Sequence, residues 1–137
     1  MKKLIIILIF VCTSAINLYS KTIWVKDHTS NVSSIASFVS LLNEGLLLTK
    51  YKDQIKIVND TKELPLEKGD IVIKYFGNTT KTNPTNISYF YYIVCKIDEN
   101  KKWEFIYTST SMFTDDHITE SIVKSRNEIE QLLILHF

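Results

Sequence analysis

The stretch ISYFYYIVCKI, residues 87–97, is where this sequence comes nearest to a recognisable chemistry. It places four consecutive aromatic residues just before Cys95, the only cysteine outside the first twenty residues. Two interpretations are open at this point. The stretch could form a stacking surface beside a reactive thiol, or it could be a strand in the interior of a small domain.

A reactive cysteine needs a nearby base and an environment that favours the thiolate. The candidate bases are three histidines that no spacing or motif ties to Cys95: His28, His117 and His136. Side chains alternate between the two faces of a strand, so Cys95 shares a face with Ile93 and Ile97. Because apolar neighbours disfavour a thiolate, we interpret Cys95 as a structural, buried cysteine rather than a nucleophile.

The aromatic residues of the same stretch divide between its two faces, with Tyr89 and Tyr91 on one and Phe90 and Tyr92 on the other. Platforms that stack nucleic-acid bases combine exposed aromatics with a basic groove, and this stretch holds a single lysine. Its two apolar faces predict a central strand that is covered on both sides. Buried tyrosine hydroxyls still need hydrogen-bond partners. We therefore keep a small-ligand pocket as an alternative, with the following binding residues: Tyr89, Tyr91 and Trp103.

Metal and phosphate chemistry have weaker support. Asp115, Asp116 and His117 are adjacent, and adjacent residues point in different directions, so they converge on one ion only with distant help, for instance from Asp27 and His28. The acidic pair more simply caps the helix that follows it. The glycines are scattered, and no Walker, Rossmann, Gly-x-Ser-x-Gly or His-Glu-x-x-His pattern occurs. We expect no metal and no cofactor, and we favour a non-enzymatic protein over an unfamiliar enzyme.

Residues 1–20 have the layout of a secretory signal peptide. Lys2 and Lys3 supply the positive start, residues 4–11 are an unbroken apolar run, and residues 13–15 are small. The apolar run is well short of the roughly 20 residues that span a bilayer. We therefore predict a cleaved leader rather than an uncleaved membrane anchor.

Cleavage could follow either Ala15 or Ser20. A third interpretation is a lipoprotein with Cys12 lipidated, although the bulky residues before Cys12 match bacterial lipoprotein signals poorly. With the leader removed, we expect an exported protein, periplasmic or extracellular, that has no membrane span.

The charge balance of the chain also bounds its partners. The chain has 16 basic and 15 acidic residues, and removing the leader takes away two lysines, so the mature net charge is about −1. Such a balance predicts no electrostatic footprint for nucleic acid or anionic membranes. Residues 21–137 fit a single domain. Without Cys12, Cys95 has no intramolecular disulfide partner, so the fold must depend on hydrophobic burial.

Periodicity predicts the elements of this domain. Five segments have the β-branched, aromatic and apolar composition of strands: 22–25, 54–58, 70–76, 87–97 and 103–108. Two segments carry the apolar stripe of an amphipathic helix: 32–46, with Val32, Ile35, Val39, Leu42 and Leu46, and the segment after Asp116, with Ile118, Ile122, Ile129, Leu132, Leu133 and His136. The Thr/Asn run 78–86 is interpreted as a polar loop, and 98–102 as a hairpin turn.

The resulting element order is β-α-β-β-β-β-α. A strand–helix–strand start makes a parallel pair through a crossover, and the later strands predict an antiparallel meander. We therefore predict a mixed α/β domain, with a mixed sheet of about five strands and two helices packed on it.

This element order, with three local stretches, resembles a group of bacterial envelope proteins. IKIVND, which follows a serine-rich helix, is similar to the helix-to-strand segment of the TolB amino-terminal domain and its CsgG- and LpoB-like relatives. GDIVIKYFG resembles their next strand, KIDENKKWEF resembles their hairpin, and a closing helix is shared. The resemblance implies a non-enzymatic envelope domain that binds other proteins.

These observations favour a secreted or periplasmic accessory domain whose partner is an envelope or extracellular protein. Its expected binding surface is the polar segment 78–86, because long polar loops often carry binding function. The alternative is a small-ligand-binding protein or an unfamiliar enzyme that uses the aromatic pocket named above.

Overall fold

The computed structural model describes residues 21–29, 35–59, 64–81 and 86–137. The leader, its cleavage site and Cys12 lie outside these ranges, so the prediction of export is untested. Within the ranges, no helix combines the length and the apolar character needed to cross a membrane.

The predicted element order is confirmed. The strands are β1 (Ile23–Asp27), β2 (Ile55–Val58), β3 (Ile71–Lys81), β4 (Asn86–Ile97) and β5 (Trp103–Phe113). The helices are α2 (Ala36–Leu47) and α3 (Ile118–His136), the latter preceded by a 3-10 turn, η2 (Asp115–His117).

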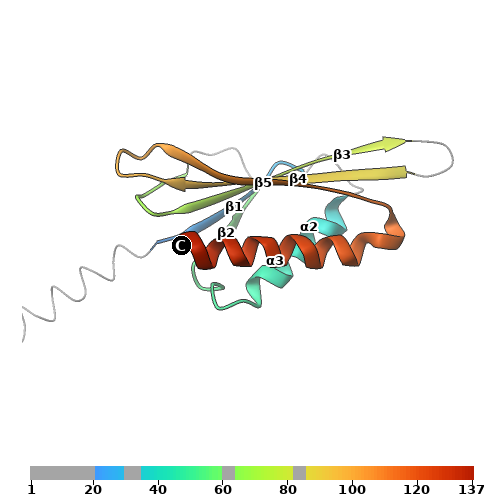
Figure 1. Cartoon of the computed structure of the whole chain (residues 1–137), viewed down its shortest axis with the longest axis horizontal. Helices are drawn as coiled ribbons and strands as arrows, with labels where there is room; N and C mark the ends of the chain where they lie inside the picture. Colours follow the sequence, from blue (N-terminus) through green and yellow to red (C-terminus); the bar gives the residue numbers. More distant parts are fainter. Residues whose placement is uncertain (1–20, 30–34, 60–63, 82–85) are drawn as a thin grey trace, which may run out of the picture.

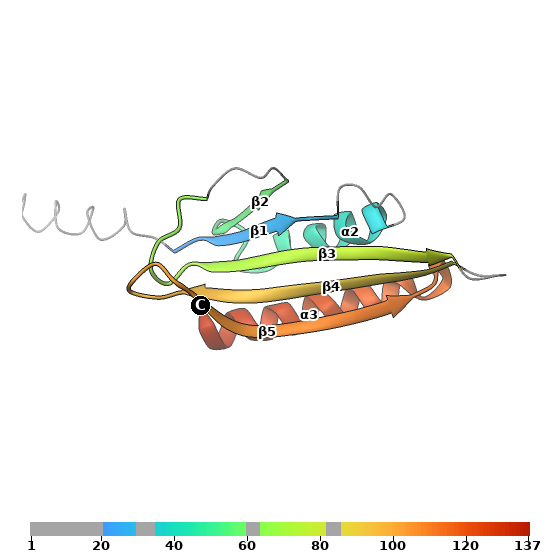
Figure 2. The same ribbon diagram turned by 90° about the horizontal axis from the view of Figure 1, so that it is seen from above.

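All five strands join in one mixed sheet with the spatial order β2-β1-β3-β4-β5 (Figure 2). β1 runs parallel to both β2 and β3, and β3, β4 and β5 form an antiparallel meander. The parallel start and the meander were both predicted. The centre of the sheet, however, is β3 rather than β4.

Both helices lie on the same face of the sheet (Figure 1). The predicted stripes are buried there, as Leu42 and Leu46 in α2 and Ile129 and Leu133 in α3 show. The main core between helices and sheet contains Ile23, Val25, Ile35, Phe38, Val39, Leu42, Leu46, Ile55, Ile71, Ile73, Tyr75, Phe90, Tyr92, Val94, Phe113, Ile122, Ile129 and Leu133.

The opposite face has only a small covered area. Trp24, Val72 and Ile97 are buried there against Leu64 and Leu66, from the segment before β3. Elsewhere this face carries half-exposed side chains, so the prediction that β4 is covered on both sides is wrong. Only the face with Phe90 and Tyr92 is packed under helices.

The interpretation of 78–86 as a loop is also wrong. β3 continues to Lys81 and β4 begins at Asn86, so most of the segment belongs to a long hairpin. The physical reason is that threonine is β-branched and suits an exposed strand as well as a loop. β5 likewise runs beyond the predicted end at 108 and continues to Phe113. Serine and threonine dominate the added part of the strand.

α2 begins at Ala36, after Ile35 at the N-cap position. Ser30 and Asn31, whose residue types are typical of helix caps, lie outside the described ranges. The start of α3 departs from the predicted cap. The acidic pair before α3 does not cap it, because the 3-10 turn η2 intervenes and places His117 at the N-cap. His117 makes no capping side-chain hydrogen bond, so packing rather than capping stabilises this start.

Gly77 permits a close approach in this packing. A Cβ atom there would lie 2.3 Å from Cδ1 of Ile35, at the start of α2. Heavy atoms cannot approach so closely, so a side chain at this position would require the buried end of Ile35 to move, and it would also lie only 3.2 Å from the backbone oxygen of Tyr89.

Candidate functional site

The uncovered part of the sheet carries aromatic and cationic side chains that are partly exposed. Strand register and side-chain alternation place the following residues on it: Lys26, Lys56, Lys74, Phe76, Asn78, Tyr89, Tyr91, Ile93, Cys95, Trp103, Phe105, Thr108, Thr110 and Met112. No described helix lies over this side (Figures 1 and 2). We call this set the open face.

The three predicted ligand-binding residues all lie on the open face, but not together. Tyr89 and Tyr91 pair with the far half of β5, whereas Trp103 pairs with Ile97 at the opposite end. Tyr91 and Ile97 are six positions apart on β4, which is about 20 Å of strand. The ring of Trp103 nevertheless lies 4.5 Å from Nζ of Lys74, whose strand partner is Ile93. Ligand binding by these three residues remains a prediction.

An aromatic row crosses three elements of the open face. The ring of His28, just after β1, stacks on Phe76 at 4.7 Å between centroids, with the planes 5° apart. Phe76 in turn stacks on its cross-strand neighbour Tyr91 at 4.9 Å and 12°. Tyr91 keeps 38% of its surface exposed. Mutual stacking fixes these rings, so a partner could use their apolar area at little cost in side-chain entropy.

The charges of the open face are all positive. Lys26 and Lys74 are directly opposite in the β1–β3 pair, and Nζ of Lys74 lies 4.5 Å from the ring centroid of Trp103. Among the described residues, no carboxylate forms an ion pair with either lysine. Burial, together with the positive charge of both lysines, lowers the pKa of His28 below its usual value, so His28 is neutral at pH 7. Like charges on opposite strand positions repel, which makes this surface receptive to a carboxylate.

Cys95 lies on the open face in a partly buried position. Its register neighbours are Val72 on β3 and Phe105 on β5. Burial raises the pKa of its thiol, and the nearby charge of Lys74 opposes this only in part. The prediction that the surroundings of Cys95 disfavour its thiolate is therefore confirmed, although Cys95 is less buried than predicted. Its setting disfavours a nucleophile at neutral pH.

Two polar clusters that the sequence did not reveal lie away from the open face. Glu128 of α3 accepts hydrogen bonds from the hydroxyls of Tyr92 (3.2 Å), Tyr107 (3.1 Å) and Ser109 (3.2 Å). Asp70, only 2% exposed, accepts three more at the start of the sheet. Each carboxylate accepts hydrogen bonds from donors on neighbouring elements and so holds those elements together. We therefore interpret both residues as stabilising the fold.

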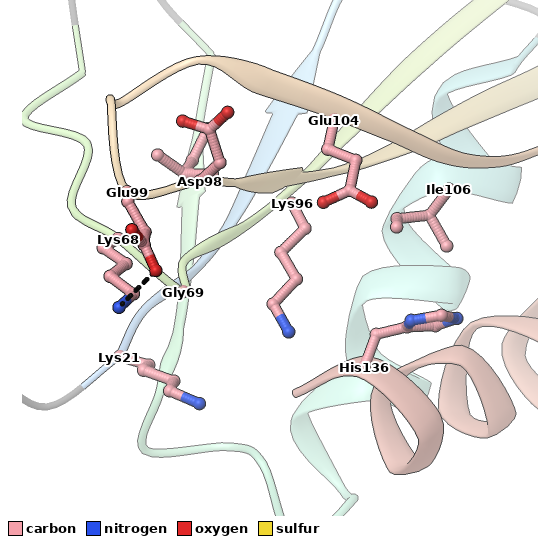
Figure 3. Close-up of a pocket in the computed structure, with 10 residues that line it drawn as sticks. Lys21, Lys68, Gly69, Lys96, Asp98, Glu99, Glu104, Ile106 and His136 are labelled. Carbon is pink, nitrogen blue, oxygen red and sulfur yellow. Dashed lines mark hydrogen bonds and ion pairs between the residues drawn. The ribbon is translucent and has the colours of Figure 1, made fainter.

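A hollow of about 460 Å³ lies between the β4–β5 turn and the end of α3 (Figure 3). Lys96 and Glu104 come from the strands, and His136 comes from the helix. Lys68 and Glu99 form an ion pair at its rim (3.4 Å), but both side chains are well exposed. Three lysines and three carboxylates line the hollow together, so it offers no clear preference for either charge.

The described residues contain no group of three or more His, Cys, Asp or Glu side chains that could hold a metal ion. His117 lies 3.9 Å from Glu120 on α3, whereas His28 stacks on Phe76 in the aromatic row. The two histidines therefore have different neighbours.

Sequence reasoning missed Lys74, Phe76 and Phe105 as surface residues. Alternation along β3 does separate Ile71, Ile73 and Tyr75 from the residues between them, which lie on the other face. It does not tell which of the two faces the helices cover, so the exposed face could not be identified from the sequence.

Comparisons with known proteins add little to this picture. No protein-family model matches the chain, and no curated protein matches it. One solved structure, the hypothetical protein CT253 from Chlamydia trachomatis, is 12% identical over 72% of this chain and 78% of that one, with a TM-score of 0.32. The resemblance to the TolB, CsgG and LpoB group stays a prediction.

Proposed function

We propose that this chain is an exported, non-enzymatic interaction domain of the cell envelope, which binds an acidic protein partner through the open face. One observation carries the proposal. Aromatic and cationic side chains extend for about 20 Å along a sheet face that no described helix covers.

The size of the surface favours a protein over a small molecule. A ligand pocket collects its contacts within a few ångströms, whereas protein interfaces use anchors spread over a patch of some 800 Å² per partner. Tyrosine and tryptophan are enriched among such anchors. Tyr91 and Trp103 lie on different parts of the surface, and 38% and 44% of their respective areas are exposed.

The charge of the surface supports an acidic partner. Lys26 and Lys74 lie opposite each other without a described ion-pair partner. A carboxylate placed between them would relieve their repulsion and would guide the approach of the partner. The export part of the proposal is supported by the signal-peptide layout of residues 1–20.

The alternative is a small-ligand-binding protein or an unfamiliar enzyme. What favours it is the stacked row of His28, Phe76 and Tyr91, on which a flat ligand could lie. Such a ligand would lie over the aromatic row.

Site-specific photo-crosslinking in living cells tests the proposal. A photoreactive residue at Asn78, on the open face, is compared with one at Gln131, exposed on α3. We expect a protein adduct from position 78 only. The adduct should be lost in Lys74→Glu and kept in the matched charge reversal Lys124→Glu on α3.

The purified partner should then bind Lys74→Glu at least about tenfold more weakly than the wild type in calorimetry, because a like-charge contact replaces an attractive one. Equal adducts from positions 78 and 131, or unchanged affinity in Lys74→Glu, would contradict the proposal. An adduct with nucleic acid instead of protein would contradict the partner class. Binding of a small molecule that depends on Tyr91 alone would favour the alternative.

A further inference from the structure

The outer edge of the sheet at β5 is long, and none of the described strands pairs with it. β5 has eleven residues and occupies one end of the strand order. The other edge strand, β2, has only four residues and includes Lys56. An unpaired strand presents a row of free N–H and C=O groups to any extended segment that reaches it.

β5 lacks the usual protection of an edge strand. Natural edges carry lysine, proline or inward-pointing charges that prevent pairing with another chain. From Phe105 to Thr114 this sequence has no charged residue, no proline and no glycine. One bulge, at Ile106, interrupts the strand near its start, so the regular part is 107–113.

The regular part of β5 is nearly symmetric about its middle residue, Thr110. In the sequence YTSTSMF, serines flank Thr110 on both sides and aromatic residues stand at both ends. Antiparallel pairing of two copies about Thr110 puts Ser109 opposite Ser111 and Tyr107 opposite Phe113. Each of these pairs shares a face of the sheet, as strand pairing requires.

We propose that two copies of this chain associate through β5, which pairs antiparallel with its counterpart about a dyad at Thr110 and so joins the two mixed sheets into one continuous sheet of ten strands. The uncharged, symmetric strand favours a second copy as the occupant, since no side chain on it repels its own kind. The two open faces would then lie on the same side of the combined sheet. Partner binding at the open face is not required for this contact.

The position of α3 agrees with the proposal. Glu128 bonds to both β4 and β5, and Ser125 faces Ser111, so α3 lies beneath this strand pair. Strands are about 4.8 Å apart, so the dyad would bring the two α3 helices to about 10 Å, which is a normal helix-packing distance.

Charge substitution at the dyad tests this contact. In sedimentation over a dilution series, the purified wild-type protein should approach the mass of two chains. Thr110→Lys should raise the dissociation constant at least about tenfold, because it places two ammonium groups opposite each other. The uncharged Thr110→Val and the distant Asn78→Lys, also on the open face, should leave it unchanged.

Mixing Thr110→Lys with Thr110→Glu should restore two-chain complexes, and this result would separate charge repulsion from misfolding. A wild-type mass of one chain at every concentration overturns the proposal, and so does a dimer that Thr110→Lys leaves intact. The sedimentation result does not depend on whether a crosslinked adduct forms from position 78. The dimer proposal and the partner-binding proposal can therefore fail separately.

Discussion

Replacement of Asp70 by alanine should be one of the most damaging single changes to this fold. The Asp70 carboxylate accepts hydrogen bonds from the backbone N–H of Thr22 (2.9 Å) and Glu67 (3.0 Å), and from the indole N–H of Trp24 (3.0 Å). These bonds join the start of β1 to the turn before β3. The carboxylate is almost completely buried, so water cannot easily replace it.

The expected magnitude follows from what each donor loses. The bond from Trp24 is buried, and a buried donor left without a partner costs about 1–3 kcal/mol. The two backbone donors are partly buried and recover some hydration, so each should cost about 0.5–1.5 kcal/mol. We expect Asp70→Ala to lower the free energy of unfolding by about 2–6 kcal/mol. Asp70→Asn keeps one acceptor oxygen and should cost about half as much.

Urea unfolding followed by circular dichroism measures this loss. The matched control is Asp98→Ala, because Asp98 also accepts two backbone N–H bonds, but at the exposed β4–β5 turn. It should cost about 1 kcal/mol or less. In a double-mutant cycle, Trp24→Phe should reduce the cost of Asp70→Ala by about 1–2 kcal/mol. Equal costs for Asp70→Ala and Asp98→Ala, or no coupling to Trp24, would refute this reasoning.

The remaining predictions concern titrating groups. Burial raises the pKa of Cys95, so iodoacetamide should modify it more slowly in the folded protein than in urea at the same mildly alkaline pH; equal rates would show the thiol to be activated. Burial, with Asp27 nearby, also raises the pKa of Tyr75 above its ordinary value near 10. The unfolded chain then loses this proton first, so stability is full below about pH 10 and falls above it, by up to about 1.4 kcal/mol per pH unit. Tyr75→Phe should flatten this alkaline loss in urea melts, and an unchanged pH slope would show that other groups cause it.

The sequence was sufficient to predict the order of elements and the main core. Hydrophobic periodicity in α2 and α3 pointed to the residues that are buried, such as Leu42 and Ile129. Strand composition located all five strands to within a few residues, except at the ends of β3 and β5. There the many threonines and serines suit a strand and a loop equally well.

The candidate site was harder to predict, for a different physical reason. Tyr91 and Phe76 are large and apolar, and burial is the usual explanation of such residues. In the fold they stack on each other at a surface, which lowers the cost of leaving them exposed. Which face of β4 receives the helices depends on long-range packing with α2 and α3, and no local pattern encodes it. Asp70 could not be identified either, since its donors come from three separate positions in the chain.

The strand order has a consequence for the sequence of events in folding. β3, β4 and β5 are consecutive in the chain, so their pairing needs only local closure. β1 must instead meet β3 across a long separation, as the bond from Thr22 to Asp70, 48 residues apart, illustrates. Distant contacts form more slowly because the loop between them must lose more entropy. The two tryptophans report on different stages, and the fluorescence change of Trp103 in the meander should precede that of Trp24 at the parallel seam.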